Sequence, residues 1–134
     1  MRCLYPFLQT LECHEALGME NGAIGDGQIS ASSQWDDNHA ARQGRLQFKQ
    51  NGRKEGSWSS RKNDQNQWLQ IDMGDHHKVT GVGTQGRDSV KYKQWVTKYQ
   101  LLFSNDGVNF QDYKGQGTAR KVKQALSANA TISS

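Results

Sequence analysis

Hydrophobic residues alternate with polar ones in several short segments, and this two-residue period is typical of β-strands. Residues 67–73 and 97–104 give the clearest predicted strands, and residues 79–84 resume the pattern. Glycines are many and helical runs are few, so we expect an all-β fold. The side chains expected in its core are Leu69, Ile71, Tyr99, Leu101 and Phe103.

Turn-forming residues separate these segments. Asn51-Gly52 predicts one hairpin, and Asn105-Asp-Gly107 predicts a second that returns through residues 108–110. Residues 74–78 are expected to form a polar turn between two strands. Strands and turns that succeed one another at this spacing indicate a β-sandwich or barrel.

Composition agrees with this interpretation. The 134 residues fit one domain, and 14 glycines against one proline favour short strands and tight turns. The net charge of +4 suits an anionic partner such as phospholipid, sulfated glycan or nucleic acid, but the 17 basic and 13 acidic residues are interspersed. A solvated mixed-charge surface explains that pattern better. Nucleic acid is not predicted, because no phosphate-binding loop, zinc-finger spacing or basic helix occurs.

The sequence predicts no enzyme and no cofactor. No Gly-x-Ser-x-Gly motif occurs. His76 and His77 follow Asp72 and Asp75, but adjacent side chains on a strand point to opposite faces and rarely share a metal. If calcium is used, the oxygen donors to consider are Asp26 and Asp72, although no EF-hand-like loop is present.

Four sequence blocks in order resemble the discoidin family, also called the coagulation-factor type C domain. They are residues 18–35, 56–59, 67–74 and 84–87, within a region that covers residues 13–122. The resemblance implies a jelly-roll (galactose-binding-like) β-sandwich and a non-enzymatic, extracellular binding module. Its ligand-contacting loops would lie at one end of the sandwich.

By this resemblance, three loop tips would contact ligand: residues 32–39, 51–54 and 88–92. Trp35 could insert into lipid, stack on a sugar or anchor in a protein groove, or it could only pin its loop. Arg87 could bind a carboxylate or sulfate, or pair with Asp88 or Asp36. Trp58, Trp68 and Trp95 are assigned to the framework. The predicted ligand-binding residues are Trp35, Asp36, Asp37, Asn38, His39, Arg87, Lys91 and Tyr92.

The first tip also suggests the class of ligand. Its Ser-Ser-Gln-Trp spelling is similar to that of the collagen-binding discoidin-domain receptors, which favours a collagen-like matrix protein or a cell-surface glycan. Asp36 and Asp37 would be repelled by anionic phospholipid, which makes a peripheral membrane module the alternative. A truncated remnant that binds nothing is a third hypothesis.

The ends of the chain depart from the family pattern. We expect a leader or upstream remnant at residues 1–12, an incomplete discoidin-type domain at residues 13–122 and a divergent tail at residues 123–134. The closing strands are expected to be missing. No convincing signal peptide is recognised, and Asn129 is the one candidate glycosylation site.

The two cysteines, Cys3 and Cys13, are both close to the N-terminus. By resemblance, Cys13 matches the first cysteine of the family's usual disulfide, whose second member has no counterpart after it. We therefore predict a free thiol at Cys13, with a bridge to Cys3 as the alternative.

Overall fold

A computed structural model describes residues 15–114, 121–128 and 131–133. In these residues, helical structure is limited to short 3₁₀ turns, so the predicted all-β fold is confirmed. The elements are η1 (Asp26–Gln28), β1 (Ile29–Ala31), η2 (Asp37–His39), η3 (Ala41–Gly44), β2 (Leu69–Lys78), β3 (Trp95–Lys98), β4 (Leu101–Ser104), β5 (Gln111–Asp112), β6 (Lys121–Ala128) and β7 (Thr131–Ser133).

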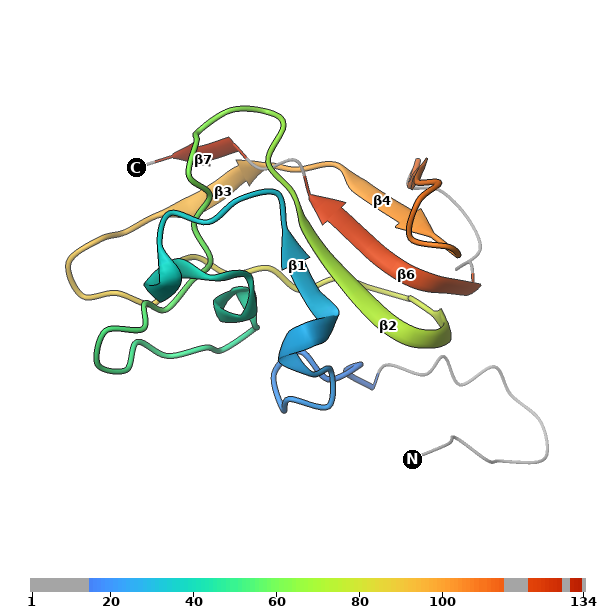
Figure 1. Cartoon of the computed structure of the whole chain (residues 1–134), viewed down its shortest axis with the longest axis horizontal. Coiled ribbons are helices and arrows are strands. Elements are labelled where there is room, and N and C mark those ends of the chain that lie inside the picture. The colour runs from blue at the N-terminus through green and yellow to red at the C-terminus, as the bar shows by residue number, and fades with distance from the viewer. Residues whose placement is uncertain (1–14, 115–120, 129–130, 134) are drawn as a thin grey trace.

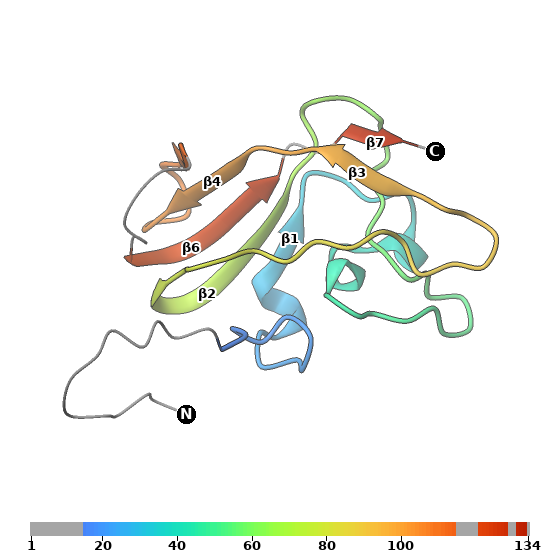
Figure 2. The same ribbon diagram turned by 180° about the vertical axis from the view of Figure 1, so that it is seen from behind.

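The strands form two antiparallel sheets. The larger has five strands in the order β1-β2-β6-β4-β5, and the smaller pairs β3 with β7. Figure 1 shows β2 and β6 side by side at the centre of the larger sheet. Seen from behind, the segment that follows β2 crosses one face of this sheet before it reaches β3 (Figure 2).

The apolar core lies against β2, as the alternation predicts. Met73 is buried, and Ile71, Val79 and Phe103 pack against it. Burial of such side chains stabilises the fold by about 1.5–3 kcal/mol each. Tyr99 is a correction, because it is 47% exposed. The predicted strand at residues 97–104 is in fact two strands, and Tyr99 lies in the break between β3 and β4.

Two further predictions were wrong at the end of β2. Residues 74–78 belong to β2 and do not form the expected turn, because the last two of them continue the pairing with β6 as His77↔Val122 and Lys78↔Lys121. The ladder shifts between Asp72 and His77, which marks a bulge. Residues 79–84 were expected to form a strand and form none.

Both predicted hairpins are present. Asn51 and Lys54 exchange backbone hydrogen bonds of 3.0 Å, and Gly52 between them adopts φ +59°. After β4 the chain turns and returns as β5, later than the expected residues 108–110. Hydrogen bonds from the backbone and side chain of Asn109 hold the pKa of Asp106, in this second turn, well below its ordinary value.

The C-terminal part of the chain contributes strands to both sheets. β6 pairs with β2 and with β4, and β7 pairs with β3. Residue 122, where the discoidin-type domain was expected to end, therefore lies inside β6. The division of the chain into leader, domain and tail remains a prediction. Cys3, Cys13 and Asn129 lie outside the described residues. Within those residues, no helix is long and apolar enough to cross a membrane.

Candidate functional site

Three loops gather beside the N-terminal end of β2, on the left of Figure 1. We call residues 32–39 the first loop, residues 49–56 the second loop and residues 84–94 the third loop. They correspond to the three tips expected from the sequence. Backbone hydrogen bonds tie the first loop to the second and the second to the third.

The first loop presents an exposed indole on a fixed backbone. Trp35 is 61% exposed, and its backbone N–H donates to the Ser59 carbonyl at 2.8 Å. Asp36 begins η2 as its N-cap, accepting from the Asn38 N–H at 2.9 Å and lying 2.7 Å from Nδ1 of His39. These contacts, with His39 the largest cause, lower the pKa of Asp36. The loop is thus held by polar contacts of its backbone, which leaves the indole accessible.

A buried glutamine supports the first loop from beneath. Gln43 is almost completely buried, which is rare for an amide side chain. Its Oε1 accepts from the Ala40 N–H, and its Nε2 donates to the Asn38 carbonyl. Sequence reasoning missed this residue, because no local pattern distinguishes a buried glutamine from the many polar residues around it.

Glu55 connects all three loops. Its backbone N–H donates to the Asn38 carbonyl of the first loop at 2.9 Å. Its carboxylate accepts from Nη2 of Arg87 in the third loop at 2.6 Å. Arg87 was expected either to face ligand or to pair with Asp88 or Asp36, and its acidic partner is Glu55 instead.

The Arg87 guanidinium is enclosed by the protein. Its side chain is only 9% exposed, its Nη1 donates to Oε1 of Gln94 at 2.8 Å, and the Tyr92 ring centre lies 5.1 Å from its Cζ. Its Nε is buried without a hydrogen-bond partner. The side chain is therefore placed to hold the second and third loops together.

Gly56 permits the closest approach between the second and third loops. It forms an isolated antiparallel bridge with Asp88, and the Asp88 N–H donates to the Gly56 carbonyl at 3.2 Å. A Cβ at position 56 would lie 2.3 Å from the Asp88 carbonyl oxygen, so only glycine fits. The Asp88 carboxylate in turn accepts from the Gln50 N–H at 3.2 Å and lies 3.6 Å from Nζ of Lys49.

The tip of the third loop combines charge with apolar surface. Nζ of Lys91 lies 5.0 Å from the centre of the Tyr92 ring, and Tyr92 raises the pKa of Lys91. Val90 is 96% exposed, the most exposed of the large hydrophobic side chains that the structure describes. It lay within the expected tip but was not singled out, because a single valine in a polar loop gives no pattern.

The framework tryptophans and the acidic residues considered for calcium were also placed. Trp58 is half-buried and donates from Nε1 to the Ser33 carbonyl at 2.9 Å, and Trp68 is half-buried. Trp95, also assigned to the framework, is 52% exposed on β3.

The two acidic residues considered for calcium have other partners. Asp26 is 2.6 Å from Nη2 of Arg45, and Asp72 accepts from the Gly74 N–H. In the part of the chain that the structure describes, no three His, Cys, Asp or Glu side chains gather as a metal site.

The family model for the F5/8 type C domain matches residues 28–133. The chain belongs to the F5/8 type C domain family. The match includes the segments that form β6 and β7. It confirms the discoidin resemblance seen in the sequence, together with the discoidin-like fold.

Relatives and solved structures agree with this assignment. The chain is 36% identical to rat lactadherin over 121 residues, which is 88% of this chain and 28% of that protein. It is 40% identical to human neuropilin-1 over 101 residues, or 74% of this chain and 10% of that protein. Discoidin II of Dictyostelium discoideum has the same fold, with a TM-score of 0.67 at 21% identity over 78% of this chain and 50% of that one. The chain therefore spans less than a third of either relative's length.

Proposed function

We propose that this chain is an extracellular recognition module, without enzymatic activity, that binds a matrix protein or a cell-surface glycan through the three loops. The observation that carries the proposal is the arrangement of these loops. Polar contacts centred on Glu55 fix their backbones, while Trp35 and Val90 stand exposed at their tips. A fixed loop with an exposed aromatic loses little entropy on binding, which is how anchor residues achieve affinity.

A collagen-like protein is the first ligand to test, because the first loop resembles that of the collagen-binding receptors. Trp35→Ala should weaken the affinity for the true ligand by about 2 kcal/mol or more, roughly 30-fold. Tyr113→Ala is the matched control, since it removes an exposed aromatic side chain next to β5, the edge strand of the larger sheet opposite β1. Binding is measured on immobilised collagen, sulfated glycan and phosphatidylserine vesicles. If neither variant changes any affinity, Trp35 only pins its loop and the proposal fails.

Phospholipid is the second candidate, and the exposed Val90 beside Lys91 is the observation that favours it. An apolar tip can enter the hydrocarbon boundary while neighbouring lysines contact anionic headgroups. Vesicle binding that survives high salt and is abolished by Trp35→Ala would establish this alternative. Against it, the exposed carboxylates of Asp36 and Asp37 beside Trp35 would have to approach an anionic surface.

The remaining hypothesis, a remnant that binds nothing, makes a different prediction. It predicts that the chain binds none of the three surfaces and unfolds without a cooperative transition. A cooperative urea transition together with saturable binding to any one of them would exclude it.

A further inference from the structure

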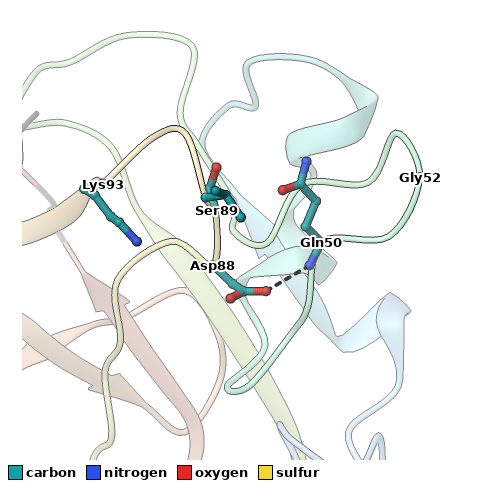
Figure 3. A pocket seen from close by; sticks show the side chains of 6 residues that line it. Gln50, Gly52, Asp88, Ser89 and Lys93 are labelled. Carbon is teal, nitrogen blue, oxygen red and sulfur yellow. Dashed lines mark hydrogen bonds between the residues drawn. The ribbon is translucent and has the colours of Figure 1, made fainter.

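A shallow depression of about 570 Å³ lies between the second and third loops. Figure 3 shows Gln50 and Gly52 on one side and Asp88, Ser89 and Lys93 on the other. Val90 completes the lining. The bridge between Gly56 and Asp88 fixes the distance between the two walls, so the depression is set by backbone contacts.

The charge surplus of the chain lies in the two segments that supply the lining of this depression. Residues 49–54 and 88–93 together contain five basic side chains and one acidic side chain, Asp88. Elsewhere twelve basic residues balance twelve acidic ones, so these two segments account for the whole net charge of +4. The mixed-charge surface inferred from composition therefore describes the rest of the chain but not this part.

Most of these cations have no acidic partner. Asp88 already accepts from the Gln50 N–H and pairs with Lys49, and Lys91 lies against the Tyr92 ring. Among the residues that the structure describes, no carboxylate lies within ion-pairing distance of Arg53, Lys54 or Lys93. Three cations that face solvent on two adjoining loops attract an anion, and their charges remain available for it.

The uncharged groups of the lining suit a sugar. The Ser89 hydroxyl and the Gln50 side-chain amide can exchange hydrogen bonds with ring hydroxyls. A Cβ at Gly52 would meet no atom within 4 Å, so the backbone there is open to a ligand. Val90 supplies apolar surface at the rim.

We propose that the depression between the second and third loops binds the sulfate groups of a sulfated glycan chain. This inference rests on the proposed function and assigns a ligand class to part of the same loop surface. The cations come from two loops and only Lys93 among them lines the depression, which fits a chain that carries repeated sulfates better than one phosphate headgroup. Arg53 can contact a sulfate through two parallel N–H donors, and the lysines act as point charges.

The test compares two triple variants that remove equal charge. Arg53→Gln/Lys54→Gln/Lys93→Gln removes the unpaired cations of the second and third loops. Of these, Lys93 lines the depression, and Arg53 and Lys54 directly follow its lining residue Gly52. Lys62→Gln/Lys78→Gln/Lys98→Gln is the control, because these exposed lysines lie outside the second and third loops. Affinity for a heparin octasaccharide is measured calorimetrically at several salt concentrations, and urea unfolding verifies that each variant folds. A chemically desulfated octasaccharide serves as the ligand control.

We expect the depression variant to weaken octasaccharide binding about tenfold or more and to flatten its salt dependence, since several exposed ion pairs are lost together. The control variant should change affinity less than about threefold by lowering the net charge alone. Equal losses in the two variants, or equal binding of the desulfated chain, would overturn the proposal. Stronger binding to phosphatidylserine vesicles than to octasaccharide, with the same dependence on these cations, would assign the site to a membrane instead.

The result also separates this inference from the proposed function. If the octasaccharide does not bind but collagen is captured in a Trp35-dependent manner, the glycan inference fails and the recognition module stands. If octasaccharide binding depends on the three cations while collagen does not bind, the inference stands and the matrix-protein ligand is rejected.

Discussion

Met73 and Arg87 are both shielded from water, but different interactions hold them in place. Met73 packs among Ile71, Val79 and Phe103, which contribute apolar area. Arg87 is enclosed by Glu55, Gln94 and the Tyr92 ring, which contribute charge and hydrogen bonds. The apolar cluster therefore supports the fold, whereas the polar cluster sets the relative positions of the loops.

This difference has a consequence for substitutions. Apolar burial is non-directional, so its loss lowers the stability of the whole domain. Hydrogen bonds and ion pairs are directional, and losing one partner leaves the other unsatisfied at its own position. Substitutions near Arg87 should therefore weaken ligand binding more than would be expected from the decrease they cause in the free energy of unfolding.

Met73→Ala should have the largest effect on stability. Truncation leaves a cavity against β2, and changes of this kind cost about 2–5 kcal/mol. Both the sheet and the loops should lose structure together in a single urea transition shifted to lower denaturant. Val108→Ala, which truncates a largely exposed side chain, is the control and should leave the midpoint almost unchanged. A variant that keeps its midpoint would show that Met73 is not part of a packed core.

Glu55→Ala should have a smaller effect on stability and a larger effect on binding. It leaves the buried Arg87 guanidinium without its carboxylate, at a cost of about 1–3 kcal/mol. The backbone bond from residue 55 to Asn38 would remain, so the loops should loosen without unfolding. Amide hydrogen exchange in the first and third loops measures this loosening.

Two controls sharpen the Glu55 experiment. Glu55→Gln keeps an acceptor near Arg87 and should lose less than Glu55→Ala. Lys49→Gln breaks a longer, solvent-exposed contact with Asp88 and should cost under about 1 kcal/mol. If Glu55→Ala changes neither exchange nor binding, Glu55 does not connect the loops energetically, whatever its contacts.

The same contrast explains how much the sequence could predict. The core strand β2 was visible because its alternation is local, and Met73 lies where the two-residue period places it. The end of β2 was mistaken for a turn because its partner, β6, lies far along the chain. Register with a distant strand is not written in the pattern of either strand alone.

The site was predicted in outline only. Position in the family blocks located the three loops and singled out Trp35 and Arg87. The partner of Arg87 was missed because Glu55 is 32 residues away and carries no motif of its own. Likewise, the balanced composition concealed the cations near the depression, because only folding brings residues 49–54 and 88–93 together.

The prediction with the smallest expected effect concerns Asp106, in the turn between β4 and β5, which lies outside the three loops. It tests whether hydrogen bonds to a charged side chain fix this turn as they fix the loops. Asp106 accepts hydrogen bonds from the N–H groups of Val108 and Asn109 and from the Ser104 hydroxyl. Folding lowers its pKa, so the charged carboxylate is the form that stabilises the turn. That contribution is complete above the ordinary pKa of 3.8 and is lost progressively as the pH falls below it towards the folded value.

Asp106→Asn should therefore lower the urea midpoint at pH 7 and at pH 5 by the same small amount, and the difference from the unaltered chain should shrink at pH 3. Asn109→Ala removes a donor that does not titrate, which separates loss of the hydrogen bond from loss of the charge. If Asp106→Asn lowers the urea midpoint by the same amount at all three pH values, the charge of Asp106 does not stabilise the turn. In that case hydrogen bonds to charged side chains would fix the three loops but not this turn.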